Sequence, residues 1–257
     1  MHRLQSKSDA LYTQMRDDIL SLSLAPDCPL RLPAMAERYG VGVTPIRECL
    51  NRLSTEKLVA ITHNKGFRVA GISFSELLDL EHSRSAIEGT LFQRSVARGD
   101  DAWEARVIGA FHQLSKTPAM SVTGTQGDID LWNRRHAAFH AALIGAAETS
   151  WLQHFQRQLA DQLGRYQLFI QTGLRDLFES HPDNAPAVAD IYAKAMATDP
   201  HEDLYEVLLS RDAARARTVF EQHVNLSICA FQELRRLIPA GTVVATTLQT
   251  QTQKAPS

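Results

Sequence analysis

The sequence predicts a mainly α-helical fold in two parts, a small N-terminal part that includes a β-hairpin and a larger all-α part. Three observations predict it. Apolar residues recur at helical spacing along most of the 257 residues. Two β-prone runs around a Gly-containing turn lie within residues 58–70. From Ser73 onward the pattern is helical and carries no strand signal, so we expect an antiparallel helical bundle there.

The N-terminal part begins with two short helices. Residues Leu11–Leu22 have the apolar spacing of an amphipathic helix, and the run 25–29, which contains two prolines, breaks it. Residues Leu32–Tyr39 form the second helix. We expect Gly40 to end it as a left-handed C-cap, because glycine takes that backbone conformation without strain.

The third helix is the most informative element of the chain. We expect Thr44 to be its N-cap and Pro45 its first residue, where a missing N–H leaves no hydrogen bond unmade. Its apolar side faces a small core. Four polar residues are left facing outward: Thr44, Arg47, Asn51 and Arg52. A short helix with hydroxyl, guanidinium and amide groups on its exposed side has the shape that enters a DNA major groove.

A hairpin completes this part of the chain. The third helix is expected to end near Glu56, and residues 58–62 and 67–70 then pair around a turn at 63–66. Three helices followed by a hairpin make a winged helix-turn-helix. We therefore assign residues 1–71 to a DNA-binding domain.

The remaining helices are assigned to a second, all-helical domain for effector binding and dimerisation, residues 72–239. The expected segments are 74–98, 101–116, 127–147, 150–172, 185–197, 201–210 and 212–237. The tail 240–257 is rich in Thr and Gln and lacks periodic apolar residues, so we expect it to be disordered.

Charge is distributed unevenly along the chain. Residues 1–70 carry ten Lys and Arg against seven Asp and Glu, whereas the remainder has a net charge of −5. This asymmetry fits a DNA-facing N-terminal domain. The chain has no apolar run long enough to cross a bilayer, no apolar signal region and no CxxC spacing among its three cysteines. We expect a cytoplasmic protein with no membrane partner.

The N-terminal part resembles the winged-helix domain of the gluconate-repressor (GntR) family of bacterial transcription factors. The resemblance covers about residues 8–70 and lies in motifs such as Met35-Ala-Glu-Arg-Tyr-Gly-Val41 and Thr44-Pro-Ile-Arg-Glu48. It implies an operator in double-stranded DNA, read by Arg47, and arginine can indeed span the O6 and N7 acceptors of guanine. Most members have a small hydroxyl residue and then Arg where this chain has Gly42 and Val43. The operator sequence therefore does not follow from the family.

The candidate DNA-contacting residues come from the third helix, the start of the second helix and the hairpin turn. They are Arg31, Thr44, Arg47, Asn51, Arg52, His63, Lys65 and Gly66. Arg31 and Arg52 can equally pair with a carboxylate, and Lys65 can be an ordinary surface residue.

Four histidines form a second constellation. His136 and His140 lie one helical turn apart on one face, a spacing that can chelate a metal ion. His201 and His223 each lie eleven residues from Asp212, on successive predicted helices. Residues equidistant from the turn of an antiparallel helix pair end up level, so both can meet the first pair. The sequence thus favours a metal site, with a metal-free pocket of hydrogen-bonding histidines as the alternative.

This pattern resembles the ligand-binding domain of the fatty-acid-regulator (FadR, or FCD) subfamily, many members of which bind a divalent metal through Asp and three His. His140, His201 and His223 match the three His positions, and His136 stands at the Asp position. The resemblance implies a bound divalent ion, Zn or Ni. Imidazole in place of carboxylate leaves such a site one charge more positive, which favours an anionic effector.

The predicted effector is a small organic acid. Arg84 is expected to hold its carboxylate, although Arg84 can instead pair with Glu88 on its own helix. Glu88, Arg165 and Tyr166 are the other candidate effector residues. The stretches Glu76-Leu-Leu-Asp79, Ala97–Ala105 and Leu131–His140 resemble glutarate-sensing repressors that are induced by carbon starvation. This closer resemblance implies a short dicarboxylate such as glutarate.

We therefore expect a homodimeric regulator that binds two half-sites of a near-palindromic operator and is released by its effector. A regulator that responds directly to metal is the alternative. A metal-dependent enzyme is disfavoured, because the sequence shows no general base and the winged helix would have no role.

Overall fold

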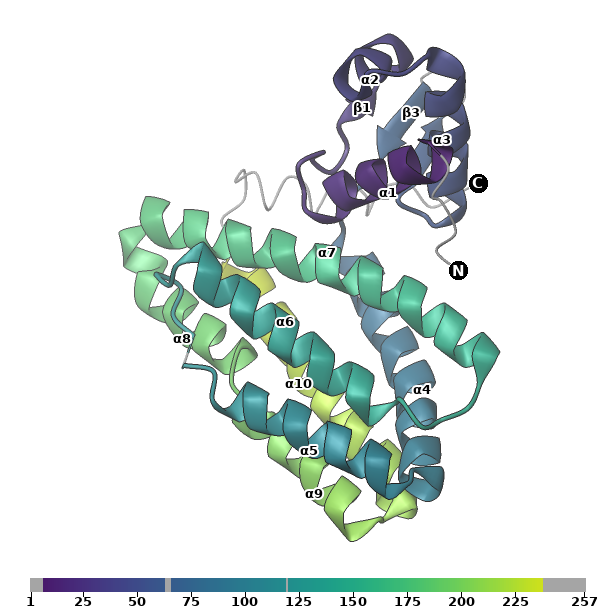
Figure 1. Ribbon diagram of the computed structural model, residues 1–257. Helices are drawn as coiled ribbons and strands as arrows, with labels where there is room; N and C mark the ends of the chain where they lie inside the picture. The colour runs from purple at the N-terminus through teal and green to yellow at the C-terminus, as the bar shows by residue number, and fades with distance from the viewer. Residues whose placement is uncertain (1–6, 63–65, 119, 238–257) are drawn as a thin grey trace, which may run out of the picture. The chain divides into compact units, whose positions relative to one another are not determined.

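The computed structural model describes residues 7–62, 66–118 and 120–237. The chain divides into two compact units (Figure 1). Among the described residues, the first comprises those up to Leu77 together with Ala160–Phe169, and the second comprises Leu78–Leu159 and those from Ile170 to Leu237. His63, Lys65 and the predicted tail, residues 240–257, lie outside the described residues.

The described residues of the first unit up to Val69 form three helices and a small antiparallel sheet. Its elements are α1 (Lys7–Leu20), β1 (Pro29–Leu30), α2 (Leu32–Tyr39), α3 (Val43–Thr55), β2 (Val59–Thr62) and β3 (Gly66–Val69). The strand order is β1-β3-β2, so the predicted hairpin gains a third strand. Sequence reasoning missed β1, because two residues after a proline turn are too short to show a period.

Two glycines of this unit have positive φ: one is the C-cap of a helix, and the other is the first residue of a strand. Gly40 has φ 65°, and its N–H donates to the carbonyls of Ala36 and Glu37, as predicted for the C-cap of α2. Gly66 begins β3 with φ 78°, and an added Cβ would meet no atom within 4 Å. Backbone conformation, not crowding, therefore requires glycine at both positions.

The predicted N-cap of α3 is wrong by two residues. The helix begins at Val43, and the cap residue is Gly42, whose backbone is extended (φ −72°, ψ 166°). Thr44 is the second helical residue and therefore not the cap. Pro45 is then the third residue, where its missing N–H still falls among the four that have no intrahelical acceptor. Thr44 is exposed.

The second unit is all-helical among its described residues. Its elements are α4 (Phe74–Arg98, which starts in the first unit), α5 (Asp101–Ser115), α6 (Gln126–Leu143), α7 (Ser150–Ser180, whose residues Ala160–Phe169 belong to the first unit), η1 (Pro182–Asn184), α8 (Ala185–Ala195), η2 (Asp199–His201), α9 (Glu202–Ser210) and α10 (Ala213–Leu237). Figure 1 shows α5 beside α6. Helix α7 runs eight residues beyond the predicted end, because buried Leu174 and Leu177 continue its apolar face.

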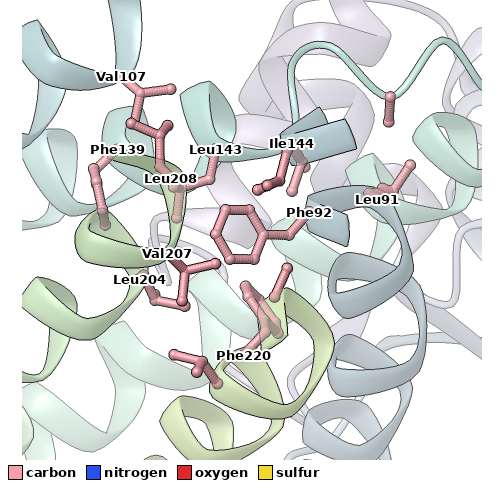
Figure 2. Packing of buried hydrophobic residues seen from close by; sticks show 14 of the residues in the cluster. Leu91, Phe92, Val107, Phe139, Leu143, Ile144, Leu204, Val207, Leu208 and Phe220 are labelled. Carbon is pink, nitrogen blue, oxygen red and sulfur yellow. The ribbon is translucent and has the colours of Figure 1, made fainter. Parts of the chain in front are cut away.

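The core of this unit brings α4, α5, α6, α9 and α10 together. Figure 2 shows Phe92 at its centre, between Leu143 and Ile144 on one side and Val207 and Phe220 on the other. Trp103 is wholly buried, and its indole N–H donates to the carbonyl of Ala142 at 2.8 Å. The core thereby joins α5 to the end of α6, the helix that carries two of the four histidines.

None of the helices within the described residues combines the length and apolar character needed to cross a membrane.

Candidate metal and effector site

The four histidines of the second unit meet. His136 and His140 lie on α6, His201 closes η2, and His223 lies on α10. One potential ligand atom from each lies within 4.8 Å of every other. The ring centroids of His201 and His223 are 4.6 Å apart, and those of His136 and His140 are 4.5 Å apart. The geometric prediction made from Asp212 is confirmed.

Backbone carbonyls fix the tautomers of two of these rings. Nδ1 of His201 lies 3.1 Å from the carbonyl oxygen of Thr198, and Nδ1 of His223 lies 3.3 Å from that of Pro200. A carbonyl only accepts, so Nδ1 must carry the hydrogen in each ring and Nε2 keeps a lone pair. Nε2 of His201 is buried without a hydrogen-bond partner among the described residues. Support of this kind behind an imidazole is typical of a metal ligand.

All four histidines are held neutral. Burial lowers the pKa of His136, His140 and His223 well below the usual value. Burial also lowers the pKa of His201 to about 4, against a smaller opposing effect of its hydrogen bond to Thr198. A metal binds only the neutral imidazole, so the donors are in the required form at neutral pH. Four imidazole nitrogens suit zinc, nickel or copper. The residues therefore fit a divalent ion.

Arg84 lies beside this cluster, buried to all but 5% of its surface. Its Nη2 is 3.2 Å from Nδ1 of His140 and 3.4 Å from Nε2 of that ring. Its Nε donates to Glu88 at 3.0 Å, and Glu88 also accepts from Gln156. The alternative reading, pairing with Glu88, is present, and Arg84 also contacts His140, whereas its role in holding an effector carboxylate stays a prediction. Its Nε and Nη2 are already engaged, so an effector carboxylate would have to share them or bind Nη1.

Sequence reasoning missed two side chains of this site. Glu81 lies one turn before Arg84 and is wholly buried, and neither of its carboxyl oxygens has a hydrogen-bond partner among the described residues. Trp132 stacks on His136 with ring centroids 4.4 Å apart, and its buried indole N–H has no partner there either. Trp132 could have been predicted, because it lies one helical turn before His136 and therefore on the same face of α6. For Glu81 the sequence carried no signal, because a glutamate in a helix is ordinarily a surface residue.

The other two effector candidates make their hydrogen bonds elsewhere, within the first unit. Arg165 donates to the carbonyls of Ala70 at 2.7 Å and Gly71 at 3.2 Å. The hydroxyl of Tyr166 donates to Glu76 at 2.5 Å and accepts from the N–H of Ser73 at 3.2 Å. Both side chains thus hold the segment that precedes and begins α4, and neither of these contacts involves a histidine.

On the first unit, α3 presents its polar side to solvent. Thr44, Arg47 and Asn51 are exposed, whereas the opposite side of the helix, with Ile46 and Leu50, is fully buried. The spacing of three and four residues places the exposed groups on one face. This face is the arrangement that major-groove reading requires.

The two remaining described arginine candidates differ from each other. Arg31 is exposed at the N-cap position of α2, where its side chain makes no cap hydrogen bond. Arg52 is held by α1: its Nη1 is 3.2 Å from Asp9, and its guanidinium lies 3.7 Å from the ring centroid of Tyr12. Arg52 therefore follows the alternative reading, in which it pairs with a carboxylate.

Comparison with known proteins finds a matching family for each of the two units. Residues 7–69 match the family described as "Bacterial regulatory proteins, gntR family", and residues 79–226 match the FCD domain. The HTH-type transcriptional repressor GlaR of Escherichia coli (strain K12) is 34% identical over 222 residues, which are 86% of this chain and 94% of that protein.

The chain belongs to the GntR family. It is a transcriptional regulator with an FCD domain, not an enzyme. Another GntR-type relative, the uncharacterised regulator BphR of Paraburkholderia xenovorans (strain LB400), is 30% identical over 90% of this chain and 87% of its own. Among solved structures, E. coli McbR/YncC has a TM-score of 0.61 at 17% identity, covering 89% of this chain and 99% of that one. A putative GntR regulator from Rhodococcus sp. RHA1 has a TM-score of 0.60 at 18% identity. These two similarities show a shared fold.

Proposed function

We propose that this GntR-family regulator is a cytoplasmic, homodimeric repressor that leaves its operator when a small organic acid binds the second unit. The acid is a short dicarboxylate such as glutarate, and it binds beside a divalent metal ion held by His136, His140, His201 and His223. Residues 1–71 bind the operator, and residues 72–239 bind the effector. The similarity to the repressor GlaR supports the direction of the response.

One observation carries the input site: four neutral imidazoles converge, and the Nε2 of His201 is buried without a partner. A buried acceptor without a partner costs about 1–3 kcal/mol, and a metal ion would remove that cost. A bound ion would supply a Lewis acid that holds a carboxylate oxygen. Arg84, with one guanidinium nitrogen directed at His140, adds a cationic donor on the same side.

The output is carried by α3. Arg47 is exposed there, and it can reach the O6 and N7 acceptors of a guanine in the major groove. Thr44 and Asn51 on the same face can contact phosphate or a base edge.

Thermodynamic linkage between effector binding and DNA binding sets a condition on the effector's affinities. The effector releases the repressor only if it binds the DNA-free conformation more tightly than the DNA-bound one, because equal affinity for both would shift nothing. Differential affinity of about 100-fold, roughly 2.7 kcal/mol, is ample for a regulatory switch.

A regulator that responds directly to metal is the second candidate, and one observation favours it. Four protein nitrogens are enough to complete a tetrahedral coordination shell, and a metal site with four protein ligands needs no further one. In that case the metal itself is the signal.

Two measurements on the full-length protein test the proposal. A thermal-shift screen of small carboxylates on zinc-loaded protein should show a raised midpoint with short dicarboxylates, because a ligand of the folded state stabilises by mass action. Fluorescence anisotropy with operator DNA should then show that the same acid weakens DNA binding. If chelation alone abolishes or restores operator binding at every carboxylate concentration, the direct metal-responsive regulator is correct instead.

A further inference from the structure

Val43 is an exposed apolar side chain at the start of α3. It is the first residue of the helix, and its exposed fraction is 41%. Val41, two residues earlier, packs against the core of the first unit, whereas Val43 lies outside that core. Valine is also a poor helix former, so the stability of the fold does not account for it. An exposed valine is ordinary by itself, and its neighbours decide whether it has a use.

The neighbours of Val43 on α3 are two candidate DNA-contacting residues. Residues four positions apart lie one above the other on a helix, so Val43, Arg47 and Asn51 form a single row. Arg47 and Asn51 are exposed, whereas Ile46 and Leu50 are buried on another side of the helix. The row therefore presents a branched apolar group, a guanidinium and an amide, one after the other, on the face that is proposed to read DNA.

The residue before Val43 leaves it accessible. Gly42 has extended backbone torsions that any residue adopts (φ −72°, ψ 166°). A Cβ added there would lie 3.8 Å from Cδ of Pro45, which is an ordinary contact. Neither the backbone nor the packing therefore requires glycine at this position. The missing side chain allows a partner to approach the start of α3 closely.

The bases of a DNA major groove offer a different group to each member of this row. Recognition helices contact base edges with residues near their N-terminus, where Val43 lies. Arginine suits the two acceptors of guanine, and asparagine suits N6 and N7 of adenine. Thymine is the base whose edge carries a methyl group, and aliphatic side chains contact that methyl group. An apolar side chain at the start of α3 therefore matches thymine.

We propose that Val43 is a specificity-determining residue of the DNA-reading face: its methyl groups contact the C5 methyl group of a thymine in the operator. This inference rests on the proposed function, in which α3 reads the major groove, and it names one base of the operator. Side chains four positions apart on a helix are about 5–6 Å apart, and successive bases are about 3.4 Å apart. The thymine therefore lies within about two base pairs of the guanine that Arg47 contacts.

The contact is small, but it costs little to form. The branched side chain of valine has one strongly preferred rotamer in a helix, so little conformational entropy is lost when it meets the base. Burying one methyl-sized group changes the affinity about fourfold. In the proposed homodimer the same contact occurs in both half-sites, so loss of both thymine methyl groups would weaken binding about 15-fold.

The experiment obtains an operator by selection from a pool of randomised duplexes with the full-length protein. Each thymine of the selected duplex is then replaced by deoxyuridine, which lacks only the C5 methyl group. Each guanine is replaced by 7-deazaguanine, which lacks the N7 acceptor. Fluorescence anisotropy without added carboxylate measures the affinities. The guanine whose N7 matters to the unsubstituted protein but not to Arg47→Ala marks the position of Arg47.

Deoxyuridine at one thymine near that guanine should weaken binding by the unsubstituted protein about fourfold per half-site. Val43→Ala should bind the thymine and deoxyuridine duplexes equally, because it lacks the methyl groups that make the contact. Val43→Ile keeps a branched apolar group and should retain the discrimination. Ile108→Ala is the matched control, since it shortens an exposed branched side chain on α5, and it should behave as the unsubstituted protein does.

Two results overturn the inference. The first is an unsubstituted protein that selects no thymine within about two base pairs of the marked guanine, or that binds deoxyuridine there as tightly as thymine. This comparison needs no variant of Val43. The second is a Val43→Ala variant that still discriminates as the unsubstituted protein does, because another residue would then contact the methyl group. If no sequence is selected, or if Arg47→Ala binds the selected duplex normally, α3 is not the reading helix and the proposed function fails as well.

Discussion

Nδ1 of His201 lies 3.1 Å from the carbonyl oxygen of Thr198. This contact fixes the orientation of the His201 ring, which lies at the end of a 3₁₀ turn, and leaves its Nε2 available as a metal ligand. The carbonyl holds the hydrogen on Nδ1, so the lone pair is on Nε2, in a ring whose centroid lies 4.6 Å from that of His223. Orientation of this kind distinguishes the cluster from a chance meeting of four histidines.

The first prediction concerns the metal. His140→Ala combined with His223→Ala should remove it, because two imidazoles are a weaker set than four. Elemental analysis of the purified protein and calorimetric titration with zinc measure the change, and the variant should lose at least 100-fold in zinc affinity. His112→Ala, which changes an exposed histidine on α5, should bind zinc as before. An unsubstituted protein without stoichiometric metal would favour the metal-free pocket.

The second prediction concerns pH in protein freed of metal by a chelator. The pKa of His201 is lowered to about 4 in the folded chain, against about 6.5 in the unfolded chain. The unfolded state therefore binds the proton first as pH falls, and the free energy of unfolding decreases between about pH 6.5 and pH 4. His201 alone should account for about 2 kcal/mol between pH 7 and pH 5.

Urea denaturation at the two pH values measures this effect. His201→Gln should show a smaller difference in unfolding free energy between pH 7 and pH 5 than the unsubstituted protein. The same difference in both would mean that His201 is accessible to protons in the folded state.

The third prediction compares two arginines of α3. Arg47→Ala should weaken specific operator binding by about 1–3 kcal/mol and leave effector binding intact, because Arg47 is exposed on the reading face. Arg52→Ala should instead lower the stability of the first unit, because Arg52 pairs with Asp9 and lies over Tyr12. Anisotropy titrations with operator and scrambled DNA separate the two effects. Loss of sequence discrimination in Arg52→Ala but not in Arg47→Ala would reverse the assignment.

The fourth prediction concerns the packing behind α6. A Cβ at Gly99 would lie 1.9 Å from Cε3 of Trp103. Trp103 cannot yield easily, since it is wholly buried and hydrogen-bonded to Ala142. Gly99→Ala should therefore destabilise the protein by about 1–3 kcal/mol.

Gly109→Ala is the matched control for that change. Gly109 lies inside α5 with no atom within 4 Å of an added Cβ, so alanine there should stabilise the helix by about 0.5–1 kcal/mol. Thermal denaturation of both variants measures the contrast, and a stabilised Gly99→Ala would contradict the packing.

Periodicity predicted the helices well because long amphipathic segments carry their own signal. The bounds of α2 and α4 agree with the expected 32–39 and 74–98. The meeting of His201 with His223 was predictable too, since equal distance from one turn is a property of helix pairs. The two-residue strand β1 and the start of α3 at Val43 were not, because each depends on a few backbone torsions rather than on a repeating pattern.

The candidate site was predictable only where spacing along the chain determines proximity. Glu81 was invisible because its importance comes from burial, and burial is a tertiary property. Arg165 was chosen as a lining residue for its position in mid-helix. Its contacts with Ala70 and Gly71 depend on how a distant segment folds back, which no local pattern reports.

The carbonyls behind His201 and His223 belong to residues 198 and 200, two positions in one short segment. Two imidazoles on different elements are therefore braced by the same stretch of backbone. Any shift of that stretch would disturb both rings together, so the cluster should assemble and come apart as a concerted event. States in which one of these two rings is oriented and the other is not should therefore be rare.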